Sequence, residues 1–340
     1  MKIILTGGGT GGHLNIVACL LESALKKGLE CIYIGSESGQ DKAWFENEAG
    51  FTQKHFLSSK GVVNQKGLGK VKSLTHTLKL ALKCKEIIHD EDIKAVFSVG
   101  GYSAAPASFG AILSKTPLFI HEQNSKSGSL NKLLKPFSKG FFSAFEPIFC
   151  PYPIKACFFE QARIRKELKT IIFLGGSQGA SFINTLALKL APKLNEMGIQ
   201  IIHQAGKFEF EKCQNAYKEL GINAEVFAFK PNLEQKMKEA DLAISRAGAS
   251  TLFELSANAL PTLFIPYPSA SKNHQYFNAK FLFDQNLCQI FTQEQAQNEA
   301  LLLQSILKLK LELISSKLKA QEYSNGADFM LEYMFKHILR

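Results

Sequence analysis

The sequence predicts an α/β protein made of two doubly wound, Rossmann-like domains in tandem. Short apolar runs alternate with helical stretches over residues 2–143, the alternation stops at a proline-rich stretch, and it starts again at residue 170. Strands that alternate with helices form right-handed βαβ units and therefore a parallel sheet covered on both faces. Glycine-rich loops directly after three of the expected strands are a further sign of this fold class.

Six strands are expected in each half, because short apolar runs recur between turn residues and helical stretches. In the first half they cover residues 2–6, 31–35, 53–57, 95–99, 118–121 and 139–143. In the second half they cover residues 170–174, 200–203, 224–228, 242–245, 262–266 and 288–291. Amphipathic helices are expected between them, for example over residues 15–27 and 74–88.

A linker is expected at residues 145–159, where three prolines occur and no hydrophobic period is visible. It divides the chain into a first domain of residues 1–150 and a second domain of residues 156–324. The last segment, residues 311–339, has a helical pattern. We expect its end, residues 325–340, to pack back on the first domain.

The composition excludes several protein classes. Hydrophobic residues make up 46% and charged residues 21% of the chain, as in globular rather than disordered proteins. No apolar run approaches the ~18 residues of a membrane-spanning helix, and the N-terminus lacks a signal-peptide pattern. The seven cysteines are odd in number and include no Cys-x-x-Cys pair, which argues against a disulfide framework or a zinc site.

The net charge of +10 leaves three kinds of partner open: nucleic acid, an anionic membrane surface, or a phosphorylated substrate. A general preference for lysine would also produce it. Much of the excess is local, since residues 60–85 contain seven lysines and no acidic residue.

Three glycine-rich loops follow strands directly, at residues 7–13, 100–103 and 175–180. Residues without a Cβ let backbone N–H groups approach a ligand, and the dipole of a following helix favours negative charge. In open α/β sheets, ligands bind at this edge of the strands. Tight packing between strand and helix explains a single such loop, but three together favour a diphosphate-bearing ligand.

The first loop also satisfies the dinucleotide pattern G-x-G-x-x-G within residues 7–12. That pattern needs an acidic residue at the end of the second strand, and here Glu37 lies past the turn. Thr10 and His13 add polar chemistry that a dinucleotide loop does not need. We therefore disfavour an NAD site.

A fourth segment, residues 245–254, contains Gly248 and ends with Glu254. Gly248 can open a helix whose N–H groups meet a phosphate. Glu254 would then accept hydrogen bonds from both hydroxyls of a ribose, as acidic residues do in nucleotide-binding folds; an ordinary charge near a helix N-terminus is the alternative. Downstream, residues 273–275 offer amide and imidazole groups for sugar hydroxyls.

Six motifs occur together along almost the whole chain. They are Gly-Gly-Thr-Gly-Gly-His at residues 8–13, Gly-Gly-Tyr at 100–102, His-Glu-Gln-Asn at 121–124, Gly-Gly-Ser-Gln-Gly-Ala at 175–180, Arg-x-Gly with a later Glu at 246–254, and His-Gln at 274–275. Each motif is unspecific alone. In this order they resemble the MurG family of N-acetylglucosaminyltransferases, which convert lipid I to lipid II in peptidoglycan synthesis.

The resemblance implies the GT-B fold, with two Rossmann-like domains facing a cleft. The first domain would lie on the acceptor and membrane side, and the second would bind UDP-N-acetylglucosamine (UDP-GlcNAc). The implied donor-binding residues are Thr10, Gly11 and Gly12 for sugar and diphosphate, Asn124 for the sugar, Lys155 and Ser177 for the diphosphate, Ala249, Ser250, Thr251, Leu252 and Phe253 for the nucleotide, Glu254 for the ribose, and Gln275 for the sugar hydroxyls.

The sequence departs from the family pattern in three places. Lys155 stands where the family usually has an arginine, so the charge is kept but the bidentate fork is lost. Asp41 replaces a glutamate after the second strand, and residues 14–16 replace an aromatic-proline pattern on the acceptor side.

The implied reaction is an inverting transfer, in which the muramoyl C4 hydroxyl of lipid I attacks the anomeric carbon of UDP-α-GlcNAc. His13 is the candidate base, because an imidazole titrates near the operating pH; ordering of the glycine loop is its alternative role. The competitors for the base are His121, Glu122 and Asp41. Helix N-termini would stabilise the leaving diphosphate. We therefore expect neither a metal ion nor another cofactor.

Lipid I is membrane-anchored, and residues 67–85 fit a basic amphipathic helix that binds an anionic surface. The alternative is an ordinary helix that covers the sheet. The implied partners are thus the substrates UDP-GlcNAc and lipid I, and no nucleic acid is expected to bind. The protein would attach peripherally to the cytoplasmic face of the inner cell membrane. The residues expected to contact the membrane are Lys70, Lys72, Leu74, Leu78 and Lys79.

Two other functions stay open at this point. One is a GT-B glycosyltransferase that acts on a different lipid acceptor, and the other is a nucleotide-sugar sensor without catalytic activity. Both would keep the donor-binding loops, so acceptor-dependent turnover is the property that separates them from lipid II synthesis.

Overall fold

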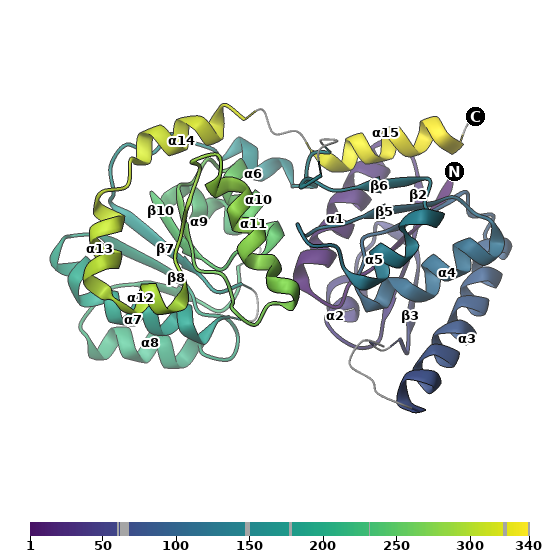
Figure 1. Ribbon diagram of the computed structural model, residues 1–340, viewed down its shortest axis with the longest axis horizontal. Helices are drawn as coiled ribbons and strands as arrows, with labels where there is room; N and C mark the ends of the chain where they lie inside the picture. Colours follow the sequence, from purple (N-terminus) through teal and green to yellow (C-terminus); the bar gives the residue numbers. More distant parts are fainter. Residues whose placement is uncertain are drawn as a thin grey trace. The chain divides into compact units, whose positions relative to one another are not determined.

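The computed structural model of this chain describes residues 1–59, 61, 68–146, 150–176, 179–230, 232–321 and 325–338, with the backbone alone at Leu68 and Lys70. The chain forms two compact units. Unit 1 comprises Met1–Ile154 and Ser324–Arg340, and unit 2 comprises Lys155–Tyr323. Each unit holds one parallel six-stranded sheet (Figure 1), which confirms the predicted fold class of two Rossmann-like domains.

The sheet of unit 1 has the strand order β3-β2-β1-β4-β5-β6. Its inner strands are apolar and buried on both faces, as parallel sheets require, and Ile3, Ile4 and Leu5 of the first strand are fully buried, whereas the edge strand β3 is partly exposed. The strands are β1 (Lys2–Thr6), β2 (Glu30–Ser36), β3 (Phe51–Leu57), β4 (Ala95–Ser98), β5 (Leu118–His121) and β6 (Gly140–Phe142).

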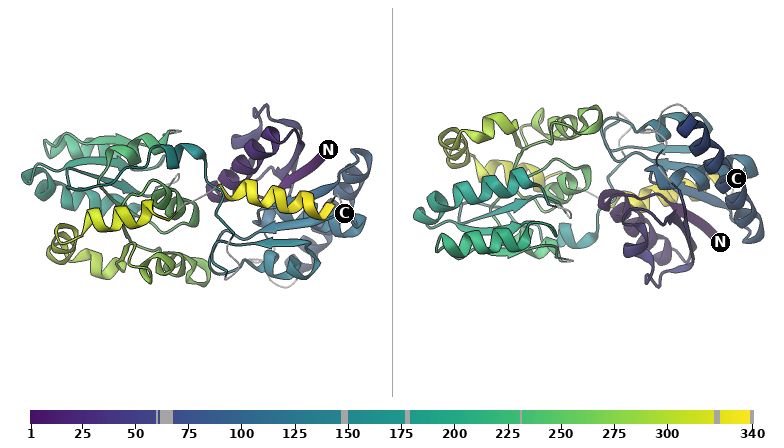
Figure 2. Two further views of the ribbon diagram at one scale, coloured as in Figure 1. Left: turned by 90° about the horizontal axis from the view of Figure 1, so that it is seen from above. Right: turned by 90° about the horizontal axis from the view of Figure 1, so that it is seen from below.

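Helices cover both faces of this sheet (Figures 1 and 2). The long α3 packs on α4, and the C-terminal α15 packs on α1 and β6. The helices of unit 1 are α1 (Gly11–Lys26), α2 (Asp41–Phe45), α3 (Leu68–Asp90), η1 (Tyr102–Ala104), α4 (Ala105–Ser114), α5 (Ser129–Leu134), η2 (Lys135–Phe137) and α15 (Gly326–Ile338).

Unit 2 repeats the topology, with the order β12-β11-β10-β7-β8-β9. Its strands are β7 (Thr170–Leu174), β8 (Gln200–Gln204), β9 (Glu225–Phe227), β10 (Leu242–Ser245), β11 (Thr262–Phe264) and β12 (Gln289–Ile290). Its helices are α6 (Ala156–Glu160), α7 (Ser181–Glu196), α8 (Phe210–Glu219), α9 (Leu233–Glu239), α10 (Ala249–Ala257), η3 (Ser271–Asn273), α11 (His274–Phe283), α12 (Gln293–Gln297), α13 (Glu299–Leu307) and α14 (Leu311–Lys319).

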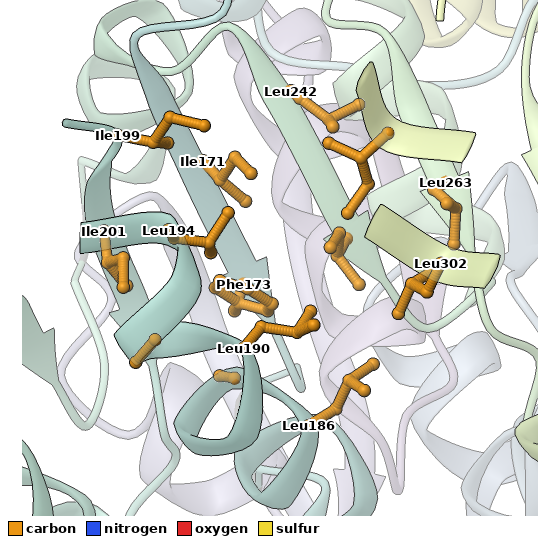
Figure 3. Packing of buried hydrophobic residues seen from close by; sticks show 14 of the residues in the cluster. Ile171, Phe173, Leu186, Leu190, Leu194, Ile199, Ile201, Leu242, Leu263 and Leu302 are labelled. Carbon is orange, nitrogen blue, oxygen red and sulfur yellow. The ribbon is translucent and has the colours of Figure 1, made fainter. Parts of the chain in front are cut away.

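In the core of unit 2, one face of helix α7 packs on side chains of strand β7. Leu186, Leu190 and Leu194 lie on one face of α7 and are almost fully buried against Ile171 and Phe173 (Figure 3). Burying a side chain of this size stabilises a fold by about 1.5–3 kcal/mol. This layer therefore holds α7 against the sheet beside β7.

The observed strands begin and end within two residues of the expected ranges. Within the described part of residues 311–338, the structure has two helices, α14 in unit 2 and α15 in unit 1. A local cap starts α15, because Asn325 Oδ1 accepts from the backbone N–H of Ala327. Gly326 starts α15 where a Cβ would overlap the carbonyl of Pro151.

Candidate active site

The glycine-rich segments lie at the two places where strand order reverses. In unit 1 the chain leaves neighbouring strands β1 and β4 in opposite directions, and the first two glycine loops follow these strands. In unit 2 the third loop follows β7 and residues 246–250 follow its neighbour β10. Loops that diverge from adjacent parallel strands leave a crevice between them, which is where open α/β sheets bind ligands.

The first two loops of unit 1 are interlocked. The backbone N–H of Gly8 donates to the carbonyl of Gly100 at 3.3 Å. Gly101 has a φ of 79°, and a Cβ there would lie 2.4 Å from the carbonyl oxygen of Gly8. Only glycine tolerates both the left-handed backbone and the close approach. The ring of Tyr102 lies over Gly9 in the same way, 2.7 Å from the position of a Cβ.

Asp41 holds the first loop from the side of β2. It is fully buried, and its Oδ1 accepts from the backbone N–H of Gly9 at 2.5 Å while Oδ2 accepts from that of Ser36 at 2.9 Å. A Cβ on Gly8 would lie 2.5 Å from both carboxylate oxygens. The carboxylate therefore orders the loop, and both of its oxygens are used in doing so.

His13 stands at the third position of α1 and is half-buried. The ring contacts the side chains of Thr10 and Gln123. Its Nδ1 lies 2.9 Å from Thr10 Oγ1, and its Nε2 lies 3.1 Å from the amide nitrogen of Gln123. Gln123 is buried and follows β5, so the second contact joins the loops after β1 and β5. Gln123 belongs to the His-Glu-Gln-Asn motif, but its contact with His13 cannot be seen in the sequence.

His121, at the end of β5, is fully buried. Burial lowers the pKa of His121 to about 3, with the nearby His13 as a smaller cause. Its ring lies edge-on to that of Tyr152, at 5.4 Å between centroids. Among the described residues, neither ring nitrogen of His121 has a hydrogen-bond partner. A neutral, weakly basic imidazole follows from this environment.

Glu122 organises the loop after β5. It is buried, and its carboxylate accepts from the backbone N–H groups of Asn124 and Gly128 at 3.0 and 2.9 Å, and from the amide of Asn131 at 3.0 Å. Asn124, the residue assigned to the donor sugar, is half-buried and starts this loop. The structure thus brings Thr10, His13 and Gln123 together. It also orders the backbone of Asn124, the residue after Gln123.

The third glycine loop packs on the end of β8. Gly179 has a φ of 82°, and a Cβ there would lie 2.4 Å from the carbonyl oxygen of Ala205. Gly176 also has a left-handed backbone, and its carbonyl accepts from the N–H of Gly179 at 3.0 Å. Ser177, assigned to the diphosphate, lies outside the described residues. The loop leads directly into α7.

The assigned nucleotide residues form the start of α10, with Gly248 as the N-cap. Ser250 and Thr251 are half-buried, while the side chains of Leu252 and Phe253 point into the unit's core, where Phe253 contacts Phe281. Glu254 is buried at 8% exposure on the second turn of the helix. Ser250 and Thr251 are therefore the more exposed side chains at the start of this helix, where backbone N–H groups are also free of intrahelical partners.

Gln275, on the first turn of α11, is tied to the loop after β11. Its Oε1 accepts from the backbone N–H of Tyr267 at 2.9 Å. Arg246 holds the same loop: it donates to the carbonyls of Ile265 and Pro266 at 3.0 and 3.3 Å, and its guanidinium lies over the Tyr267 ring. Burial lowers the pKa of Arg246. The Arg-x-Gly motif is visible in the sequence, but the role of Arg246 as a loop anchor depends on these tertiary contacts.

Lys155 is the first residue of unit 2 and the N-cap of α6, with a half-buried side chain. Within the described part of the chain, no group of three His, Cys, Asp or Glu side chains is arranged to hold a metal ion.

The expected membrane helix, α3, has two different apolar faces. Thr77, Ala81, Cys84 and Ile88 are buried in unit 1. A second stripe is exposed by 48–60%: Val71, Leu74, Leu78 and Leu82. Lys72 and Lys79 are exposed, and the side chain of Lys70 lies outside the described residues. Among the described residues, each helix is too short or too polar to span a bilayer.

Both halves of the chain match one family. Residues 3–143 match the glycosyltransferase family 28 N-terminal domain, and residues 170–330 match its C-terminal domain. A UDP-N-acetylglucosamine--N-acetylmuramyl-(pentapeptide) pyrophosphoryl-undecaprenol N-acetylglucosamine transferase from Campylobacter jejuni subsp. doylei is 68% identical, with 98% of this chain and 97% of that protein covered. The protein of the same name from Wolinella succinogenes is 50% identical, with 97% and 100% covered.

Solved structures agree with the sequence relatives. The crystal structure of Acinetobacter baumannii MurG matches with a TM-score of 0.77 at 25% identity, covering 98% of this chain and 99% of that one. The glycosyltransferase SnogD from Streptomyces nogalater matches with a TM-score of 0.64 at 13% identity, which shows a common fold alone. The chain therefore belongs to glycosyltransferase family 28 and, within it, to the MurG family of N-acetylglucosamine transferases with the GT-B fold.

Proposed function

We propose that this enzyme transfers N-acetylglucosamine from UDP-GlcNAc to the muramoyl C4 hydroxyl of lipid I, which yields lipid II and UDP. The observation that carries the proposal is the identity of 68% over nearly the full length to a transferase named for this reaction. The ordered glycine loops at both strand-order reversals support it, because a nucleotide diphosphate suits such loops.

We assign the role of general base to His13. The hydroxyl oxygen attacks the anomeric carbon, the bond to the diphosphate breaks with its electrons, and the proton passes to the imidazole. The competitors fit less well. Asp41 and Glu122 are buried and use both carboxylate oxygens to hold backbone N–H groups. Burial makes His121 too weak a base near neutral pH.

For the donor, we propose that the first turn of α10 meets the nucleotide through Ser250, Thr251 and backbone N–H groups, and that Glu254 accepts from the ribose hydroxyls. Ala249, Leu252 and Phe253 would shape this turn from the interior, since their side chains are buried. Gln275 keeps an amide N–H group for the sugar, because its oxygen is held by the Tyr267 backbone.

The N-terminus of α1 in unit 1 and that of α7 in unit 2 are each a candidate for the diphosphate, because each helix dipole favours negative charge. Thr10, Gly11, Gly12 and Ser177 belong to these loops, and Lys155 adds a positive charge. Asn124 would contact the donor sugar from its ordered loop. Charge that develops on the departing UDP is thereby stabilised.

We further propose that α3 binds the anionic cytoplasmic surface of the membrane that carries lipid I. The exposed stripe of Val71, Leu74, Leu78 and Leu82 supports this, because other residues of the helix already cover the protein core. Exposed Lys72 and Lys79 lie beside it, and each lysine near such a surface contributes about 1 kcal/mol.

The decisive test measures UDP release from UDP-GlcNAc with and without lipid I, and identifies the lipid product by mass spectrometry. We expect release only with lipid I, together with lipid II. Turnover with a different lipid acceptor alone would indicate the related glycosyltransferase. Donor binding without any acceptor-dependent turnover would indicate a sensor, and either result would overturn the proposal.

A further inference from the structure

A carboxylate from the loop after β8 holds the first turn of α7. Glu209 is half-buried and stands at the N-cap of α8, but among the described residues its side chain does not cap that helix. Its Oε1 instead accepts from Ser181 Oγ at 2.9 Å, and its Oε2 accepts from the amide of Asn184 at 2.5 Å. Ser181 and Asn184 are the first and fourth residues of α7. Glu209 therefore fixes the start of the helix that follows the third glycine loop.

The carbonyl of Ala205, the residue after β8, joins the same helix to the glycine loop. Its oxygen accepts from the amide of Asn184 at 2.9 Å, and a Cβ on Gly179 would lie 2.4 Å from it. The backbone N–H of Ala205 donates to the carbonyl of Phe227 in β9 at 2.9 Å, which holds this residue in line with the sheet. The glycine loop, the start of α7 and the end of β8 thus meet at one oxygen.

His203 fixes the orientation of the Asn184 amide. Two acceptors, the Ala205 carbonyl and the Glu209 carboxylate, face one end of the amide, so that end is the NH2 group. The amide oxygen then lies 3.0 Å from Nε2 of His203, which must carry the proton of the neutral ring. Nδ1 accepts from the hydroxyl of Tyr217 at 3.1 Å. Asn184, His203 and Tyr217 are all buried, so these hydrogen bonds allow the amide one orientation.

Glu209 is charged in this place. Partial burial works against the charge, but the hydrogen bonds from Asn184 and Ser181 outweigh it and hold the pKa of Glu209 below its ordinary value. A negative charge beside a helix N-terminus is favourable in itself, but it would repel a diphosphate bound at the same end. A positioning role and a purely electrostatic role for this carboxylate therefore predict opposite effects on diphosphate binding when the side chain is removed.

We propose that Glu209 is a positioning residue for the donor diphosphate, because it holds the start of α7 and the third glycine loop in place through Ser181 and Asn184. The inference rests on the proposed function, in which this loop and the N-terminus of α7 meet the diphosphate of UDP-GlcNAc. A preordered loop binds its ligand without a further ordering cost. Loss of the Glu209 contacts should therefore weaken binding of the diphosphate and leave binding of the nucleoside unchanged.

Binding titrations with UDP and with uridine isolate the contribution of the diphosphate, as the ratio of the two affinities. For Glu209→Ala we expect the preference for UDP to fall about tenfold, because the loop that receives the diphosphate is no longer held. Glu209→Gln offers an oxygen to Asn184 and an NH2 group to Ser181 Oγ, so it keeps both hydrogen bonds without the charge and should restore the preference.

Two results of these titrations would overturn the inference. Tighter UDP binding by Glu209→Ala would mean that the carboxylate acts through its charge, and an unchanged preference would mean that it only stabilises the fold. The matched control is Glu211→Ala, which removes the same charge from an exposed site on the same helix and should leave the preference as in the wild type. An equal loss in this control would also contradict the role of Glu209.

Steady-state kinetics separates positioning from a loss of folded protein. Glu209→Ala should raise the donor KM by about the same factor and leave the KM for lipid I unchanged, whereas a smaller folded fraction would lower the maximal rate at unchanged KM values. Glu209→Gln should again resemble the wild type. An unchanged donor KM in Glu209→Ala would contradict the inference.

A spectroscopic measurement tests the orientation of Asn184 without activity. Long-range 1H–15N spectra of histidine-labelled protein at about pH 8, where histidine is neutral, distinguish a protonated ring nitrogen from a bare one. His203→Gln identifies the signals of His203. We expect its Nε2–H form; the Nδ1–H form would mean that the amide of Asn184 is reversed and does not donate to Glu209, which would overturn the inference.

The outcomes separate this inference from the proposed function. If the wild type prefers UDP to uridine and Glu209→Ala keeps that preference, the role of Glu209 is overturned and the donor site stands. If the wild type binds UDP no more tightly than uridine, the diphosphate site of the proposed function fails, and the inference fails with it.

Discussion

The carboxylate of Asp41 accepts the backbone N–H of Gly9 at 2.5 Å and, through its other oxygen, that of Ser36 at 2.9 Å. The two N–H groups belong to the loop after β1 and to the end of β2, so one buried side chain ties neighbouring parts of unit 1 together. The N–H of Gly9 is thereby used within the protein. Ligand recognition by this loop must rely on the residues that follow it.

We predict that Asp41→Asn destabilises unit 1 by about 1–3 kcal/mol, because an amide offers one acceptor oxygen and sets an NH2 group against the other backbone donor. Turnover should fall as well, since Thr10 and His13 lie on the loop that loses its anchor. Urea denaturation and steady-state kinetics check both effects. Asp90→Asn, at an exposed site on α3, is the control and should change neither.

Arg165 is a structural anchor of unit 2. The side chain is fully buried, and it donates to the carbonyls of Ala240, Arg163, Met237 and Asn258 and to the Asn258 side chain. Burial is the main reason that its pKa is lowered to about 9. Arg165→Lys should cost at least about 3 kcal/mol, because an ammonium group cannot reach acceptors spread over the guanidinium fork. Chemical denaturation measures this loss.

The control for Arg165 is Lys166→Ala, the neighbouring residue, whose exposed ion pair with Glu312 should contribute little. Equal destabilisation by the two variants would contradict the anchoring role.

His203 should make stability depend on pH. It is buried between Tyr217 and Asn184, and burial lowers its pKa to about 4. When the pH falls below the ordinary histidine pKa of about 6.5, this side chain binds a proton in the unfolded chain but stays neutral in the folded chain. The free energy of unfolding should therefore fall from pH 6.5 towards pH 4, by at most about 1.4 kcal/mol per pH unit from this group.

His203→Gln should flatten this dependence between pH 6.5 and 4 in denaturant titrations. His89→Gln, at an exposed site, should leave it as in the wild type. A profile of His203→Gln parallel to that of the wild type would contradict the assignment.

His13→Ala should lower kcat strongly, by roughly 10²–10⁴-fold if the imidazole acts as the general base, with little change in donor affinity. Isothermal titration with UDP-GlcNAc and initial-rate kinetics measure the two quantities separately. A comparable loss of both would instead support a role in ordering the glycine loop.

The exposed stripe of α3 predicts membrane binding that depends on apolar side chains. We expect Leu74→Ser with Leu78→Ser to weaken binding to anionic vesicles without lowering Tm, since both side chains are exposed in the free protein. Leu133→Ser on α5, at a similar exposure of 58%, is the matched control. Equal loss of binding in the control would mean that the contact surface is not α3.

Lysine side chains should contribute to the same membrane contact through their positive charge. Lys72→Gln with Lys79→Gln should weaken vesicle binding, and wild-type binding should weaken as salt rises because ions screen exposed charges. Vesicle binding that is unaffected by both the substitutions and the salt would contradict an electrostatic contribution to membrane binding.

Most of the architecture could be read from local patterns. The strands could be identified from short apolar runs, and the helices and glycine loops between them indicated that consecutive strands are parallel. Every strand of both sheets was therefore expected within two residues of its observed bounds. The sequence did not show why a glycine stands at the start of α15. The reason is the close carbonyl of Pro151, far away in the sequence.

The glycine loops, the candidate base and the family motifs could thus be found in the amino-acid order, since each is a contiguous pattern. The partners of those residues could not. Gln123 meets His13 across 110 positions, and Asp41 meets Gly9 across 32, because parallel strands bring together loops that are remote in the chain. Which face of α3 is buried was also decided by packing on α4, since both of its faces are apolar enough to be the buried one.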